Sequence, residues 1–271
     1  LVVCDYLYIT PRGIFARDEL PEGERDGACR VLVVKCVWTQ CLFAHAVPQK
    51  GVDPDGFIVE KLKEDIAWLG HATVVIRRDN EPSLARVVDK AIRALKQAEG
   101  VNASWEGSVP YDPQTNGYAE GAVRLLKGMF RTLLLGLEKQ IGGRIPLDHP
   151  AVSWLVSHAA HVRNLRVIGP DGKTPNQRVK GTSTVPTLLG FGELCYYKKR
   201  SQEPGIGAMN SIWSNGIWLG VDRRTGQYVI FDKRLGGVRH ARTIKPMPLS
   251  QQWSMAQLQA VDVTPWSKHE G

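Results

Sequence analysis

The chain has 271 residues, which is enough for one large domain and a small one. Hydrophobic residues make up 43% of it, so a sizeable core can be buried. No apolar run approaches the roughly 20 residues that a membrane-spanning helix needs, and no signal peptide is evident. Lys and Arg number 35 against 27 Asp and Glu, and this net charge of +8 suits a polyanionic partner without requiring one.

The five cysteines show no C-x-x-C spacing, which argues against a structural zinc site. An odd and sparse set of cysteines indicates reduced thiols in an intracellular protein that is not secreted. The first residue is Leu1, directly in a strand-like run, so we expect a piece of a longer polyprotein.

The first part of the chain predicts an α/β core, because strand-like and helical patterns alternate along it. The segment 11–29, rich in Pro, Gly and charge, is expected to be a loop. The expected elements, in chain order, are strands at 1–9, 30–38 and 41–47, a helix at 55–70, a strand at 72–78, a helix at 82–100, a short strand at 102–106 and a long helix at 118–137. This order predicts a mixed sheet flanked by helices.

The later part of the chain changes character. A helix is expected near 150–164 and a helical turn at 173–181, and from about residue 185 short strands and turns predict a small antiparallel β domain. Its hairpin turn is expected at 222–226. The predicted organisation is therefore a core with a helical extension at 1–182, a small β-barrel-like domain at 183–250 and a tail at 251–271.

Three carboxylates occupy informative places in this pattern. Asp5 lies inside the first apolar strand, Asp79 ends the strand at 72–78, and Glu120 is expected in the first turn of the long helix. A carboxylate inside an apolar strand is costly unless it is paired or binds a metal ion. For Asp5 taken alone, a surface or strand-end position is the simpler interpretation.

The segment PYDPQTNGYAE at 110–120 resembles the loop-to-helix segment of retroviral and copia-type retrotransposon integrases. DNEP at 79–82 resembles the second aspartate motif of that family, and the first strand with Asp5 resembles its opening. Further similarity to copia-type elements is seen in KTPNQRVKG, FGELCYYKK and GIWLGVDRRTGQYVIFD. The resemblance covers the chain to about residue 250.

The resemblance implies a ribonuclease-H-like fold and a polynucleotidyl transferase that performs DNA 3′-end processing and strand transfer. It implies that Asp5, Asp79 and Glu120 are the catalytic residues and hold two Mg²⁺ or Mn²⁺ ions, which prefer such oxygen ligands. The expected partners are double-stranded DNA and further copies of the chain, without a membrane or a small-molecule cofactor. The expected place of action is the nucleus.

The long helix carries a second pattern, because Glu120, Arg124, Lys127 and Arg131 recur on one narrow stripe. A solvated charged face is the simpler interpretation of such a stripe. Beside a metal-binding glutamate, however, Arg124, Lys127 and Arg131 would guide DNA phosphates. The residues of the preceding segment that the resemblance implies to contact DNA are Tyr111, Gln114 and Asn116.

The chain after residue 182 carries eleven Lys and Arg against six Asp and Glu, with aromatic residues among them. This composition fits either a DNA-contacting β domain or an ordinary aromatic core with soluble turns.

Two alternatives to an active integrase remain open. A ribonuclease H or junction-cutting nuclease would lack the PYDPQTNG segment and the trailing β segment. A decayed element would keep DNA binding without catalysis, although the three carboxylates are intact. The 41 positions between Asp79 and Glu120 exceed the interval in many integrases, and no His-His-Cys-Cys zinc segment is present.

Overall fold

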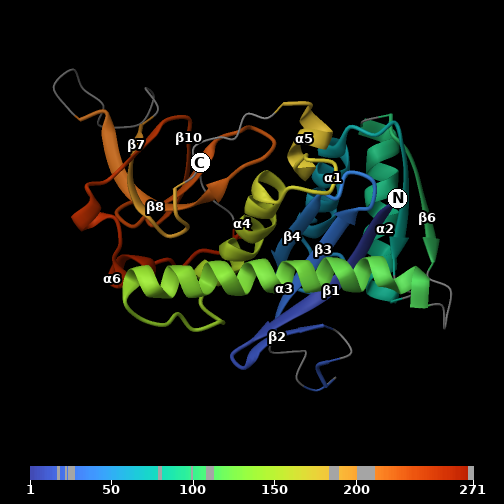
Figure 1. Cartoon of the computed structure of the whole chain (residues 1–271), viewed down its shortest axis with the longest axis horizontal. Helices are drawn as coiled ribbons and strands as arrows, with labels where there is room; N and C mark the ends of the chain where they lie inside the picture. The colour runs from blue at the N-terminus through green and yellow to red at the C-terminus, as the bar shows by residue number, and fades with distance from the viewer. Residues whose placement is uncertain are drawn as a thin grey trace.

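The computed structural model describes residues 1–16, 19–21, 23, 28–78, 81–98, 100–107, 113–182, 189–199 and 211–267, and of residues 113–116 it describes the backbone alone. Two β-sheets lie along the length of the molecule, with the long helices packed around and beneath the first (Figure 1). Within these ranges, no helix is both long and apolar enough to cross a bilayer.

The first sheet is mixed, with the strand order β4-β3-β1-β5-β6 and with β2 paired to β1. β1 pairs antiparallel with β2 and β3, whereas β1, β5 and β6 run parallel. The strands are β1 (Val2–Thr10), β2 (Gly13–Ala16), β3 (Cys29–Cys36), β4 (Leu42–Val47), β5 (Thr73–Arg78) and β6 (Asn102–Gly107).

Helices bury both faces of this sheet. Tyr6 and Tyr8 of β1 point to the face covered by α1 (Phe57–Leu69) and α2 (Pro82–Ala98). Leu7 and Ile9 alternate with them and point to α3 (Pro113–Ile141) and α4 (Pro150–Arg166). Burial on both faces explains why β1 is a nearly continuous apolar run.

β4 is an edge strand, and side chains of α4 hydrogen-bond to its open edge. Asn164 Oδ1 accepts from the Leu42 N–H (2.9 Å), and its Nδ2 donates to the Leu42 carbonyl (2.6 Å). The Ser157 hydroxyl donates to the Ala44 carbonyl (2.7 Å). α4 therefore takes the place of a further strand along part of this edge.

The second sheet is antiparallel, with the strand order β10-β9-β8-β7-β11. Its strands are β7 (Leu194–Lys198), β8 (Trp213–Val221), β9 (Tyr228–Asp232), β10 (Gly237–Ala241) and β11 (Ile244–Pro246). The predicted hairpin turn joins β8 to β9, where the Gly226 N–H donates to the Asp222 carbonyl (2.7 Å) and Gly226 adopts a φ of 69°. The predicted architecture, a mixed sheet flanked by helices and followed by a small antiparallel β unit, is confirmed.

The two sheets share one hydrophobic core. Ile217 and Phe231 of the second sheet belong to the same buried cluster as Leu155 and Ala159 of α4. The boundaries expected after residues 182 and 250 stay predictions, and the apolar packing is continuous across the first of them.

The segment expected as a tail returns to this core. This segment contains η2 (Leu249–Gln251) and α6 (Met255–Leu258), and the side chains of Leu258 in α6 and of Val261 after it are buried in the shared cluster. The Trp154 indole of α4 donates to the Val263 carbonyl (2.9 Å). Residues 251–267 thus brace α4 from its outer side.

A buried ionic contact also joins the two sheets. Asp65 of α1 is fully buried; its Oδ2 lies 2.7 Å from His45 Nε2 of β4, and Arg223 of the β8–β9 turn donates to its Oδ1. Burial raises the pKa of Asp65, but His45 and Arg223 outweigh burial and hold that pKa below its usual value. Asp65 therefore stays charged and paired.

Two expectations about local structure were wrong. The segment 11–29 is not wholly a loop, because β2 pairs with β1 in a hairpin in which Thr10 is opposite Gly13. The long helix begins at Pro113 rather than near Tyr118, so much of the expected loop is helical. In both places Pro and Gly suggested irregular structure, whereas Pro113 starts a helix, where its missing N–H costs nothing.

Candidate active site

Asp5 lies on β1, in the middle of the first sheet, with Val33 of β3 as its register partner. By alternation along the strand it shares a face with Leu7 and Ile9, which pack against α3. Its carboxylate is half-buried, and its Oδ1 accepts from the Tyr6 N–H (2.7 Å). Asp5 is thus a carboxylate on the α3 side of an otherwise apolar strand.

β5 lies beside β1 and runs parallel to it, so the two strands point in the same direction. Arg78, the last residue of β5, is the register partner of Cys4. Asp79 follows Arg78 in the sequence and lies outside the described residues. The role of Asp79 at the site therefore stays a prediction. The register supports it, because Arg78 is paired with Cys4, the residue before Asp5.

Glu120 lies on α3 with an exposed side chain. Ala122, Val123 and Leu126 of the same helix are buried in the cluster that contains Leu7. The helix that carries Glu120 therefore covers the sheet face to which Asp5 points. Because α3 begins at Pro113, Glu120 lies about two turns into the helix and not in its first turn.

The donor set suits a hard divalent cation, because carboxylate oxygens are the ligands that Mg²⁺ prefers. Within the described residues, no group of three His, Cys, Asp or Glu side chains is close enough to hold a metal ion. The predicted set of Asp5, Asp79 and Glu120 includes a residue outside those ranges. The chemistry of the three side chains fits the metal, and two of them are on the same side of the sheet.

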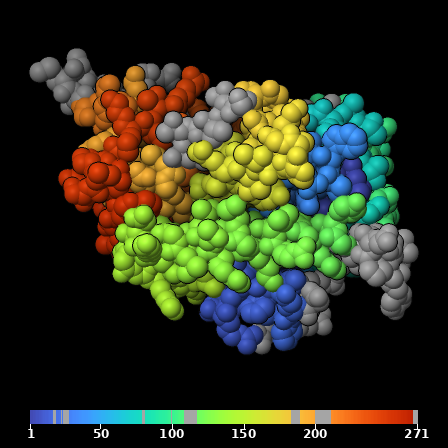
Figure 2. Space-filling model, viewed as in Figure 1, coloured from blue at the N-terminus to red at the C-terminus, as the bar shows by residue number. Residues whose placement is uncertain are grey.

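The basic stripe of α3 is exposed at two of its three positions. Arg124 and Arg131 are open to solvent, whereas Lys127 is half-buried and forms an ion pair with Glu19. The hydrogen bond from Lys127 lowers the pKa of Glu19 below its usual value. In Figure 2, α3 forms a continuous ridge across the molecule, next to the region of β2. Arg124 and Arg131 are therefore available to a partner, and Lys127 is already engaged.

The three remaining predicted DNA contacts are not tested. Tyr111 lies outside the described residues, and Gln114 and Asn116 lie in the first turn of α3, where the backbone alone is described. Two exposed aromatic side chains that the sequence interpretation did not single out are Trp105 of β6 and Tyr118 of α3. The Arg78 guanidinium stacks 4.2 Å from the centre of the Trp105 ring. The feature of the sequence that could have identified Trp105 is an aromatic residue on an expected edge strand.

The second sheet presents a mixed aromatic and basic surface. Tyr196 of β7 is opposite Asn215 of β8 and Lys245 of β11, and these directly paired residues share one face. On the same face, Lys198 is opposite Trp213, and Lys245 Nζ lies 4.6 Å from the centre of the Trp213 ring. Tyr196, Lys198, Asn215 and Lys245 are exposed. We name these four residues, together with Trp213, the β7–β8 patch.

No family model and no curated protein matches the chain. Solved structures with a similar fold include the catalytic core domain of BIV integrase, which is 17% identical, with a TM-score of 0.42 over 66% of this chain and 93% of that one. The simian T-cell lymphotropic virus intasome in complex with PP2A regulatory subunit B56 gamma is 18% identical, with a TM-score of 0.43 over 91% of this chain and 78% of that one.

The HTLV-2 integrase catalytic core domain, in a dimeric form with magnesium, is 14% identical, with a TM-score of 0.38 over 65% of this chain and 91% of that one. These values describe likeness in fold alone. Two of these three structures are integrase catalytic core domains.

Proposed function

We propose that the chain is a DNA integrase, a polynucleotidyl transferase that processes DNA 3′ ends and joins them to a target strand. The observation that carries this proposal is the position of Asp5. It is a carboxylate on the central strand of a mixed sheet, on the face covered by the helix that bears Glu120. The parallel strand β5 ends beside it and leads directly to Asp79.

In this proposal, Asp5 and Asp79 would be ligands of one Mg²⁺ or Mn²⁺ ion, and Glu120 would be a ligand of a second. When bound, such ions would supply stabilisation of the charge that develops on the oxygens during phosphoryl transfer. Asp5 is anchored by the Tyr6 N–H, so its carboxylate is held in place before DNA arrives. A water would attack in the first reaction, and the freed 3′-hydroxyl in the second.

Double-stranded DNA is the proposed partner. Arg124 and Arg131 lie one and three turns beyond Glu120 on the exposed side of α3, where they would contact phosphates next to the reacting bond. The β7–β8 patch offers a second contact surface, with two lysines beside aromatic rings. Aromatic rings and basic side chains together favour nucleic acid over other anions.

A strand-transfer assay tests the proposed function. The full chain is incubated with Mg²⁺, a supercoiled plasmid and labelled duplexes that carry free 3′-hydroxyl ends, including the terminal DNA of the element. We expect label to become joined to the plasmid. Asp5→Asn, Asp79→Asn and Glu120→Gln should each abolish joining, because each removes a metal-binding charge, and should leave the thermal unfolding midpoint nearly unchanged.

Joining that persists in Asp79→Asn would contradict the proposed site. DNA binding without joining in the unmodified chain would instead indicate a decayed element that acts as a DNA-binding protein. Arg144→Gln is a suitable control, because Arg144 is exposed and lies in the segment between α3 and α4.

A further inference from the structure

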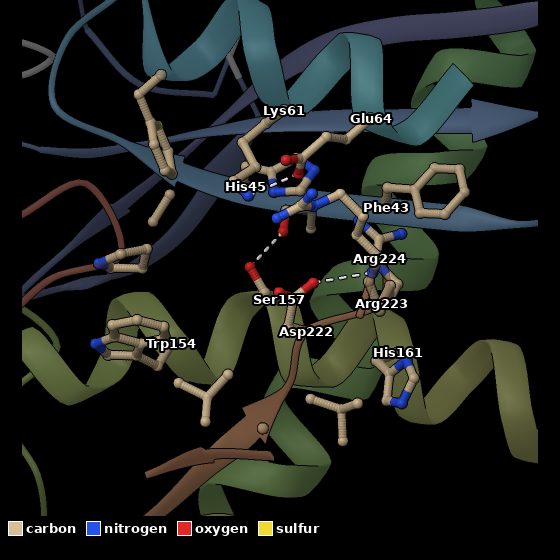
Figure 3. A pocket seen from close by; sticks show the side chains of 18 of the residues that line it. Phe43, His45, Lys61, Glu64, Trp154, Ser157, His161, Asp222, Arg223 and Arg224 are labelled. Carbon is tan, nitrogen blue, oxygen red and sulfur yellow. Dashed lines mark hydrogen bonds and ion pairs between the residues drawn. The ribbon is translucent and has the colours of Figure 1, made fainter. Parts of the chain in front are cut away.

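A cavity of about 880 Å³ lies between the two sheets. It is lined by α1, β4, α4, the β8–β9 turn and residues 265–267, and Figure 3 shows these side chains converging on it. No residue of β1 or α3 lines it, so it is separate from the candidate active site. Its volume is in the range of pockets that hold small molecules, roughly 300–1,000 Å³.

Aromatic rings form much of the wall. Phe43 of β4, Trp68 of α1, Trp154 of α4 and Trp266 near the C-terminus all line the cavity. The Phe43 and Trp68 rings meet edge to face, with centroids 5.7 Å apart. Such a wall favours a ligand with an apolar, preferably planar, body.

The charges around the cavity are nearly balanced. Among its lining residues, three of the four Lys and Arg side chains are held by carboxylates, in the pairs Lys61–Glu64, Lys63–Glu60 and Arg223–Asp65. This balance makes a polyanion such as DNA a poor occupant. The fourth cation is Arg224, whose guanidinium forms no ion pair with a described residue. Asp55 and Asp222 line the cavity as well; Asp222 Oδ1 accepts from the backbone N–H of Arg224 (2.9 Å), and its Oδ2 lies 3.9 Å from Nδ1 of His240.

Two buried imidazole nitrogens that line the cavity, Nδ1 of His158 and Nε2 of His161, have no hydrogen-bond partner among the described residues. Burial, and next the charge of Arg223, lower the pKa of His161 to about 4, so the imidazole is neutral near pH 7. His161 and Arg223 lie beside each other in Figure 3. A neutral imidazole protonated on Nε2 would donate one hydrogen bond to a ligand.

The edge of β4 supplies further donors. Since both backbone groups of Leu42 are bonded to Asn164, the strand alternation directs the N–H groups of Ala44 and Ala46 to the same open edge. Both residues line the cavity. Outside the β3–β4 ladder, neither N–H has a partner among the described residues.

We propose that this cavity binds a small organic carboxylate with an aromatic or alkyl body. The carboxylate is recognised by the Arg224 guanidinium, with hydrogen bonds from His161 and the edge of β4 as the available neutral donors. The body packs against the rings of Trp68, Trp154 and Trp266.

Calorimetry with 2-naphthoate and its neutral counterpart 2-naphthamide tests this on the full chain without DNA or metal. We expect one equivalent of 2-naphthoate to bind, at least about tenfold more tightly than the amide, because only the carboxylate forms a charge-assisted hydrogen bond with the guanidinium. Arg224→Gln should remove this preference and leave amide binding unchanged. Arg144→Gln, which removes an exposed arginine elsewhere, should leave both affinities unchanged.

A second variant tests whether the ligand binds in this cavity. Ala67 of α1 lines the cavity, so Ala67→Trp should fill it and abolish binding of both probes. Binding that survives in a folded Ala67→Trp variant, as judged by circular dichroism, would overturn the proposal. Equal affinity for the two probes, no binding of 2-naphthoate, or an unchanged preference in Arg224→Gln would overturn it as well, and Arg224 is exposed enough for its replacement to leave folding intact.

Discussion

His158 is buried against the rings of Phe191 and Trp218, whose centroids lie 5.5 and 5.0 Å from its own. Burial, and next the charge of His161, lower the pKa of His158 to about 3. A histidine in the unfolded chain has a pKa of about 6.5. Between these two values the unfolded chain binds a proton that the folded chain does not bind.

The free energy of unfolding should therefore fall as the pH falls from about 6.5 towards 4, by up to about 1.4 kcal/mol per pH unit for each such histidine. In His158→Phe the ring packing is retained and this proton uptake is removed, so the dependence on pH should be shallower. Urea denaturation at pH 7, 6, 5 and 4 measures it. An equally steep dependence in His158→Phe would show that His158 is not a source of acid instability.

At the scale of the element, α3 contributes residues both to the hydrophobic core and to the solvent-exposed surface. Leu126 and Phe130 anchor it in the core, while Arg124 and Arg131 face solvent. Lys127 lies between these surfaces and pairs with Glu19. The arginines are thus the stronger candidates for DNA contact, although the sequence pattern placed all three basic residues on one stripe.

Arg124→Glu should weaken duplex binding across sequences and lower the salt slope of binding by about one unit. Adding Lys127→Glu should weaken binding of the element's DNA ends further. Mg²⁺ binding should stay normal, because neither Arg124 nor Lys127 is a predicted metal ligand. Fluorescence anisotropy with a labelled duplex over a range of salt concentrations measures this. Lys139→Glu, an exposed reversal on the same helix farther from Glu120, is the control, and unchanged binding in Arg124→Glu would make the stripe an ordinary solvated face.

At the scale of the whole molecule, the contact between Asp65 and Arg223 joins α1 to the second sheet. The Asp65 carboxylate has no exposed surface, so removing its arginine leaves a buried charge with His45 alone. Arg223→Met should therefore destabilise the chain by about 3 kcal/mol. The double variant Asp65→Leu, Arg223→Met should recover much of this loss, and chemical denaturation of both variants at pH 7 measures it. A neutral effect of Arg223→Met would show that the contact is dispensable.

The sequence indicated the layered core and the second sheet, because the periodicity of apolar residues is a local pattern. It can be recognised without knowledge of the tertiary contacts. It did not indicate the pairing of Asp65 with Arg223, which are 158 positions apart. Asp65 has no local feature that distinguishes it from other residues of the helix expected at 55–70, and Arg223 was expected only as part of the hairpin turn at 222–226. Asp5 and Glu120 could be selected because one interrupts an apolar strand and the other ends a dense motif, whereas Trp105 has only the weaker signal of an aromatic residue on an edge strand.

The hydrogen bonds from Asn164 to Leu42 also affect how copies of the chain meet one another. An open strand edge is a template on which another molecule can add a strand, and this is a common start of aggregation. Asn164 occupies both backbone groups of Leu42, and Ser157 occupies the Ala44 carbonyl, so a foreign strand finds its first hydrogen bonds already taken. Two polar side chains of α4 thereby protect the protein from uncontrolled association at high concentration.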